Sequence, residues 1–328
     1  MNTGNEAVVR VAHAAERLCA NVGQVLQGKP DVIALAVVCL LAEGHLLIED
    51  VPGTGKTSLA RALASSLSVP WKRIQFTPDL LPSDVTGVSV YNQATSTFEF
   101  RRGPVFANVV LADEINRASP KTQSALLEVM EEGTLSADGQ VHVMPHPFMV
   151  VATQNPIDME GTYVLPEAQL DRFLMRLTVG YPDPPAEAAM LRAEKHGPTV
   201  AHLPPVLSGV EVSAMIETVK HVAVAPALEQ YIVEISVATR SLPELRLGVS
   251  PRGSLALLRA ARAAAALAGR SFVVPEDVKS VAHVVLAHRL ILQPEAELRG
   301  RTAAELVGRV LESVPVPRAA PGAALTRT

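Results

Sequence analysis

One short segment constrains the fold more than any other part of this 328-residue chain: Gly53-Thr54-Gly55-Lys56-Thr57. It follows an apolar run at 45–49, which predicts a buried strand, and it precedes a helical pattern that continues to Leu67. A glycine-rich turn between a strand and a helix directs backbone N–H groups and the positive end of the helix dipole at a phosphate. Lysine at this place contacts the β- and γ-phosphates, and the hydroxyl of the next residue holds Mg²⁺. The candidate nucleotide-binding residues of the loop are Pro52, Gly53, Thr54, Gly55, Lys56, Thr57 and Ser58.

Two acids, Asp113 and Glu114, follow a second apolar run at 109–112. If both runs are parallel strands, their carboxyl ends meet at one edge of the sheet, so these acids should lie beside the phosphate loop. There Asp113 would bind the nucleotide's Mg²⁺ together with Thr57, and Glu114 would polarise the attacking water. The alternative is that Asp113 only begins the next helix.

Strand and helix patterns alternate up to Tyr181, and the strands are nearly all apolar. This predicts a parallel sheet covered by helices on both faces. Beyond Tyr181, prolines interrupt the chain and only helical patterns follow. We therefore predict an α/β fold, with an αβα core and a smaller all-α lid. The expected ranges are 1–181 for the core, 182–211 for a Pro-rich linker, 212–316 for the lid and 317–328 for a disordered tail.

Composition narrows the functional classes. The chain is 48% hydrophobic and 19% charged, as in folded globular proteins. Its net charge of −4 argues against nucleic-acid binding through a strongly basic face. The longest apolar run, 32–42, is shorter than the about 20 residues that span a bilayer, so no membrane insertion is expected. Cys19 and Cys39 lie in helix-like apolar stretches, which predicts free thiols and a cytoplasmic protein.

A more specific pattern runs through the segments around the two acids. These segments are Gln75-Phe76-Thr77-Pro78-Asp79-Leu80-Leu81-Pro82-Ser83-Asp84, 116–123, 126–133, 152–156, 165–173 and Ser250-Pro251-Arg252. With them the chain closely resembles the MoxR family of AAA+ ATPases, from about Gln27 to Leu290. The usual phosphate loop has glycine at the place of Asp50, and this acid resembles the one that many members of the family carry. The resemblance implies an AAA+ core with a helical lid, ATP and Mg²⁺ bound between core and lid, and ATP hydrolysis.

The resemblance also assigns roles to residues outside the loop. Asn155 matches sensor 1, which contacts the γ-phosphate or the attacking water. Arg172 matches the arginine finger that AAA+ proteins supply to the ATP of the neighbouring subunit, and Arg252 matches sensor 2 of the lid. Gln27 and Gly28 match the segment that lines the adenine. The implied catalytic set is Glu114, Asn155, Arg172 and Arg252.

Each assignment has a simpler alternative. Asn155 precedes a proline, and an Asn-Pro pair also starts a turn. Arg172 would otherwise be a surface side chain paired with Asp171, and Arg252 would extend into water. For Arg252 the local sequence adds an argument, because a serine cap and a proline place it in the first turn of a helix. A cation is unfavourable there, and a bound anion would remove the penalty.

The implied assembly is a homo-hexameric, chaperone-like machine whose clients carry von Willebrand A domains. Two alternatives stay open: the ATPase motor of a magnesium-chelatase-like complex, and a nucleic-acid remodeller, which the acidic balance disfavours. Phe98 and Phe100 alternate on a predicted hairpin arm, where they face either a client or a small satellite core. His142 and His146 are separated by Pro145 and are predicted to be surface histidines and not a metal pair.

Overall fold

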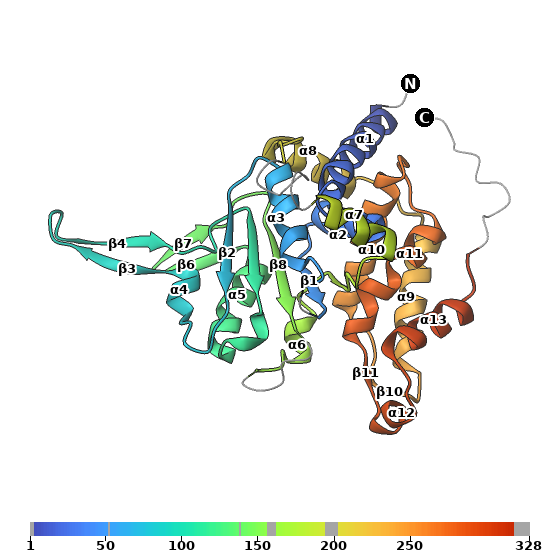
Figure 1. Cartoon of the computed structure of the whole chain (residues 1–328). Coiled ribbons are helices and arrows are strands. Elements are labelled where there is room, and N and C mark those ends of the chain that lie inside the picture. The colour runs from blue at the N-terminus through green and yellow to red at the C-terminus, as the bar shows by residue number, and fades with distance from the viewer. Residues whose placement is uncertain (1–2, 52, 138, 156–161, 194–202, 318–328) are drawn as a thin grey trace.

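A five-stranded parallel sheet forms the centre of the computed structural model, which describes residues 3–51, 53–137, 139–155, 162–193 and 203–317 (Figure 1). The strands are β1 Leu46–Glu49, β2 Trp71–Gln75, β5 Val109–Asp113, β8 Met149–Gln154 and β9 Met175–Leu177. Their order is β2-β5-β8-β1-β9, and every neighbouring pair is parallel. The carboxyl ends of all five strands therefore meet at one edge, as the sequence predicts.

Helices cover both faces of this sheet, and the side chains of β1 alternate between two hydrophobic clusters. Leu46 and Ile48 belong to the cluster that includes α3 (Lys56–Ser66). Leu47 belongs to the other cluster, which includes α5 (Pro120–Glu132). The predicted αβα core is confirmed.

The lid helices join the cluster that contains α3. They are α8 Gly209–Lys220, α9 Pro226–Arg240, α10 Pro251–Leu267, α11 Pro275–Leu286 and α13 Ala303–Ser313. The N-terminal helices α1 (Thr3–Gly23) and α2 (Pro30–Leu41) pack against α10, so they lie between the sheet and the lid (Figure 1). One hydrophobic cluster thus runs from β1 through these helices into the lid.

Beyond residue 181 the structure adds a helix and a two-stranded sheet to the predicted helices. Helix α7 (Pro184–Ala193) forms within the segment expected to be a linker, and β10 (Leu245–Leu247) pairs antiparallel with β11 (Ile291–Leu292). Pro226 and Pro251 begin helices, where the missing N–H group costs no hydrogen bond. The shorter helices are α4 Pro82–Thr86, α6 Glu167–Leu170 and α12 Pro294–Leu298, with 3-10 turns at 115–117 and 287–289.

Two antiparallel hairpins extend from the core (Figure 1). They are β3 Gly87–Asn92 with β4 Thr97–Arg102, and β6 Thr134–Ala137 with β7 Gln140–Val143. Phe98 is 71% exposed and touches Tyr91, their ring centroids 5.3 Å apart. Phe100 instead stacks on His142 at 4.6 Å and contacts Phe106. The small satellite core is therefore made by Phe100 and His142, while Phe98 stays at the surface.

His146 has different partners from His142. Its Nε2 lies 2.9 Å from Oε1 of Glu43, and its Nδ1 lies 3.0 Å from Oγ of Ser213 in α8. These contacts join the loop before β8 to the end of α2 and to the lid.

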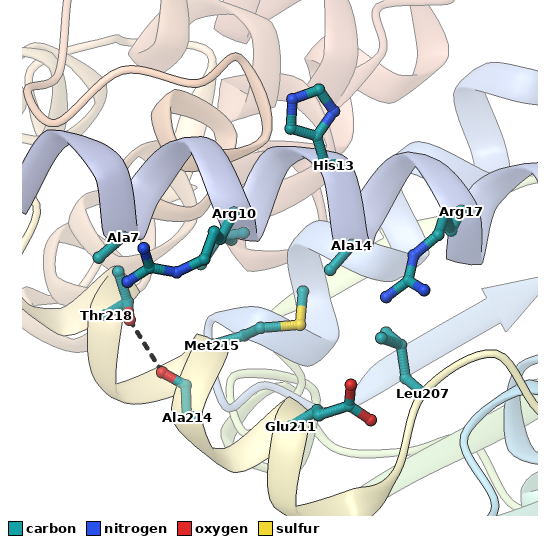
Figure 2. Close-up of a pocket in the computed structure, with 11 residues that line it drawn as sticks. Ala7, Arg10, His13, Ala14, Arg17, Leu207, Glu211, Ala214, Met215 and Thr218 are labelled. Carbon is teal, nitrogen blue, oxygen red and sulfur yellow. Dashed lines mark hydrogen bonds between the residues drawn. The ribbon is translucent and has the colours of Figure 1, made fainter.

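A groove separates α1 from α8 and has a volume of about 480 Å³ (Figure 2). Arg10 and Arg17 of α1 extend along one rim, while His13 points away from α8. Glu211 lies on the opposite rim, and hydrogen bonds from Ser208 are the main cause that lowers the pKa of its carboxyl. The N-terminal helix and the first lid helix therefore build one surface together.

His45 is buried immediately before β1 and is held neutral. Its Nε2 lies 3.0 Å from the carbonyl oxygen of Met130, and its Nδ1 accepts a hydrogen bond of 3.0 Å from the N–H of Val150. Burial is the main cause that lowers its pKa from 6.5 to about 4. Desolvation also lowers the pKa of the buried His288.

The folded chain should therefore lose stability in mild acid. The unfolded chain takes up a proton at His45 near pH 6.5, and the folded chain does so only near pH 4, so stability falls as the pH drops through this range. We expect His45 alone to lower the free energy of unfolding by about 2 kcal/mol between pH 7.5 and pH 5. Urea denaturation measures this, and a variant of the exposed His221, His221→Gln, should keep the same fall. A pH-independent free energy of unfolding would contradict the buried neutral imidazole.

Candidate active site

The loop between β1 and α3 has the backbone of a phosphate cradle. Gly53 and Gly55 have φ values of 85° and 91°, which glycine adopts readily and other residues rarely do. Gly55 caps α3, so the helix starts at Lys56. A Cβ atom added at Gly53 would meet no atom within 4 Å. The hydroxyl of Thr54 closes the turn by donating a hydrogen bond of 3.1 Å to the carbonyl oxygen of Val51. An open turn over a helix N-terminus suits a phosphate.

Lys56 extends back along this loop. Its Nζ donates to the carbonyl oxygens of Asp50, of Val51 at 3.3 Å and of Gln154 at 3.3 Å. Partial burial is the main influence on the Lys56 amine and lowers its pKa, while nearby carboxylates oppose this. The ammonium group lies among weak acceptors at the carboxyl edge of the sheet, where a charged phosphate would be a stronger one.

Asp50 stabilises the loop from outside. Its Oδ1 accepts a hydrogen bond of 2.7 Å from the N–H of Val51. Its Oδ2 accepts a hydrogen bond of 2.5 Å from the N–H of Gly180. The carboxylate therefore ties the loop to the turn that follows β9, a bond that glycine could not make. Pro52, predicted to belong to the loop, lies outside the described residues.

Asp113 ends β5 and faces the first turn of α3, where Ser58 follows Thr57. Its Oδ2 lies 3.4 Å from Oγ1 of Thr57 and 2.6 Å from a guanidinium nitrogen of Arg73, while its Oδ1 accepts 2.6 Å from the hydroxyl of Thr153. A hydroxyl and a carboxylate oxygen this close fit Mg²⁺, which prefers few protein oxygens and several waters. In the described part of the chain, no group of three or more His, Cys, Asp or Glu could hold a metal ion.

Glu114 has a backbone conformation that its neighbours impose. Its φ is 56°, uncommon for a residue other than glycine, and its N–H donates 2.9 Å to the hydroxyl of Thr153. Its Oε2 accepts from Gln75 at 3.0 Å and from Arg117 at 3.1 Å. The same Thr153 thus holds both acids, and strained backbone of this kind is concentrated at functional sites.

Asn155 follows β8 at the same edge. The register pairs Glu49 of β1 with Gln154 of β8, so Asn155 comes level with the start of the phosphate loop. It is buried, and its carbonyl accepts 3.4 Å from the side chain of Asn116. The structure therefore brings Asn155 to the edge that carries Lys56, as predicted.

Gln27 and Gly28 lie in the turn after α1, on the lid side of the loop. Leu26 comes immediately before them, and a Cβ atom added at Gly55 would lie 3.0 Å from its side chain. Gly28 has a φ of 72°, and a Cβ there would clash with Ala186 of α7 at 2.8 Å. This segment is thus held beside the loop, and its contact with the adenine stays a prediction.

Arg172 and Arg252 lie at the opposite end of the sheet, where the strands begin. The N–H of Leu174 donates 2.9 Å to the carbonyl of His45, which places Arg172 by the start of β1, whereas the phosphate loop follows its end. Both arginines bind Glu131, Arg172 through Nε at 2.9 Å and Arg252 through Nη2. Arg252 therefore does not face the phosphate loop of its own chain, and the expectation that nucleotide lies between core and lid through Arg252 does not hold within one chain.

The alternative reading, in which Arg172 pairs with Asp171, is not what the structure shows. Asp171 binds Arg289, whose side chain is only 3% exposed, at 2.7 Å, and it accepts 3.0 Å from the hydroxyl of Ser250. Arg289 reaches the carbonyl oxygen of Phe173 at 2.7 Å as well. These bonds fix the lid against the loop that carries Arg172.

No local sequence signal predicts the role of several residues of the site. They are Arg73, Gln75, Thr153, Glu131 and Arg289. Each acts through a partner far away in the sequence.

None of the described helices is both long and apolar enough to cross a membrane.

Comparison with family models and solved structures identifies the family and the fold of the chain. Residues 45–175 match the model of the ATPase family associated with various cellular activities (AAA), and residues 237–310 match the AAA lid domain. A protein from Cytophaga hutchinsonii, whose crystal structure is described as that of a proposed ATPase, superposes with a TM-score of 0.88 at 37% identity, covering 95% of this chain and 98% of that one.

Curated relatives extend over most of the chain. YeaC of Bacillus subtilis, a protein named as uncharacterised, is 50% identical over 297 residues, 90% of this chain and 93% of its own. Chaperone MoxR1 of Mycobacterium tuberculosis is 40% identical over 324 residues, which cover 96% of this chain and 85% of its own. MoxR of Paracoccus denitrificans is 34% identical over 322 residues, which cover 90% of this chain and 94% of its own. Since these matches run through both the core and the lid, the chain belongs to the MoxR family of AAA+ ATPases.

Proposed function

We propose that this chain binds and hydrolyses ATP and uses the energy to remodel client proteins. The observation that carries the proposal is the convergence of Lys56, Asp113, Glu114 and Asn155 at one edge of the sheet, beside an open phosphate loop. Hydrolysis would be phosphoryl transfer to water, in which positioning and charge neutralisation do most of the catalysis.

Each residue would have one task. Lys56 would exchange its carbonyl partners for the phosphates, and Glu114 would orient the attacking water and accept its proton. Asn155 would contact the γ-phosphate or that water. Thr57 and Asp113 would hold Mg²⁺, which when bound neutralises phosphate charge.

The position of the arginines supports a shared site. Arg172 and Arg252 lie at the edge opposite Lys56, so they would serve the ATP of a neighbouring subunit whose phosphate loop faces them. A closed ring of identical subunits satisfies this head-to-tail contact at every interface. The family resemblance favours a homo-hexamer.

The client is proposed on narrower grounds. One relative is named a chaperone, and the resemblance suggests clients with von Willebrand A domains. The exposed Phe98 and Tyr91 on the protruding β3–β4 hairpin offer an apolar contact for such a protein. Free Cys19 and Cys39 fit a reducing compartment such as the cytoplasm.

Replacing Lys56 by alanine tests the nucleotide site directly. We expect Lys56→Ala to weaken ATP binding by about 10- to 100-fold, the equivalent of the roughly 1.5–3 kcal/mol of a charged hydrogen bond. Fluorescent-nucleotide titration measures the affinity for ATP, and a phosphate-release assay measures the rate of hydrolysis. Lys121→Ala, the same change at an exposed position of α5, should leave both intact. Unchanged ATP affinity in Lys56→Ala would place the nucleotide elsewhere.

A further inference from the structure

The carboxylate of Glu131 joins the two arginines that face away from the phosphate loop. Glu131 lies in the last turn of α5, and its side chain is 30% exposed. Its Oε2 lies 2.9 Å from Nε of Arg172, which belongs to the core, and its Oε1 accepts from Nη2 of Arg252, which belongs to lid helix α10. One side chain thus bridges the core and the lid at this edge.

The surroundings explain why a carboxylate is needed there. The lining of a cavity of about 150 Å³ includes four arginines, Arg172, Arg252, Arg259 and Arg289, and three acids, Glu43, Glu131 and Asp171. Without an acid between them, the long side chains of Arg172 and Arg252 would repel each other and spread apart. Asp171 is occupied by Arg289 and Ser250, so Glu131 is the acid that touches both arginines.

Helix α5 itself gains nothing from this acid. A negative charge in the last turn of a helix lies next to the negative end of the helix dipole, which is unfavourable. Glu132 is the adjacent acid of the same turn, and its side chain has no hydrogen bond or ion pair with the described part of the chain. The purpose of Glu131 therefore lies in its partners outside the helix.

We propose that Glu131 is a positioning residue that holds Arg172 and Arg252 side by side, so that both meet the γ-phosphate of the neighbouring subunit together. This rests on the shared site proposed above. Glu131 contacts Nε of Arg172 as an ion pair without a hydrogen bond, and it accepts from one terminal nitrogen of Arg252. The terminal N–H groups of Arg172 and the other N–H groups of Arg252 are then left for the phosphate. Because Lys56 lies at the opposite edge, Glu131 should influence turnover and not the binding of ATP to its own chain.

The test is Glu131→Gln, which keeps the size of the side chain and removes its charge. We expect kcat for ATP to fall by about 10- to 100-fold, as for other losses of a supporting residue, with KM unchanged. Glu132→Gln is the matched control, the same change one residue later, and should leave kcat at the wild-type value. A Glu131→Asp variant is one methylene group shorter and reaches one guanidinium at a time, so its kcat should fall less.

Mixing experiments separate positioning from a general structural role. Glu131→Gln damages the half of the site that Arg172 provides, so activity should recover when it is co-assembled with Glu114→Gln and should not recover with Arg172→Ala. Adding Glu131→Gln to Arg172→Ala should reduce kcat further only through Arg252, by much less than in the wild-type background.

The outcomes distinguish this inference from the proposal beneath it. If Arg172→Ala and Glu114→Gln restore each other's activity but Glu131→Gln has wild-type or higher kcat, the positioning role is overturned and the shared site stands. If Glu131→Gln recovers with Arg172→Ala, Glu131 does not act through the arginines. If the Arg172→Ala and Glu114→Gln pair fails to recover although the chains co-assemble, the shared site is overturned first.

Discussion

An Arg172→Ala chain should bind ATP as tightly as the wild type and hydrolyse it about 10³–10⁵ times more slowly, the range found for arginine fingers. The reason is geometric: the guanidinium lies at the end of the sheet opposite its own phosphate loop, so the proposed finger would act on the nucleotide of a neighbour. Nucleotide titration and single-turnover hydrolysis measure the two quantities. Arg246→Ala, the same change at an exposed lid residue paired with Glu167 at 3.6 Å, is the control.

Co-assembly tests whether the defect is shared between subunits. Mixed with Glu114→Gln before nucleotide is added, Arg172→Ala should regain activity, because some interfaces combine an intact Glu114 with an intact Arg172. The recovery should decrease on dilution, since it requires association. Absence of recovery in a demonstrated mixed assembly would reject the action of Arg172 on a neighbour.

Glu114→Gln should retain ATP and lose turnover by about 10²–10⁴-fold, the usual contribution of a general base. A glutamine can still accept from Gln75 and Arg117, so the local structure should persist and only the proton-accepting carboxylate is lost. A filter-binding assay that distinguishes bound ATP from bound ADP measures this retention of uncleaved ATP.

The matched control for Glu114→Gln is Glu128→Gln, an exposed acid of α5. Its turnover should equal that of the wild type. Near-wild-type turnover in Glu114→Gln would show that another group activates the water.

Local sequence was enough to predict the strands and the loop that form the candidate nucleotide site. The apolar runs of β1, β5 and β8 are buried on both faces, and glycines at positive φ are required in the loop, so both leave a visible pattern. The acids at the end of β5 follow from the same logic. Once the strands are parallel, their ends must meet.

The residues that support the site could not be predicted in this way. Thr153 is one more polar residue at a strand end until the sheet places it between Asp113 and Glu114. The pairing of Glu131 with Arg172 and Arg252 depends on how the lid packs on the core, which no short pattern encodes. The same packing decides that Arg252 faces away from its own phosphate loop.

The hydrophobic cluster that runs from β1 through α1 and α2 into the lid has a mechanical consequence. Swinging the lid away from the core would expose its apolar side chains to water, at about 25 cal/mol for each Å² uncovered. The core and lid of one chain should accordingly turn as a single stiff arm. In the proposed ring, nucleotide hydrolysis would then rotate whole subunits against one another, and the interface between chains would be the place that bends.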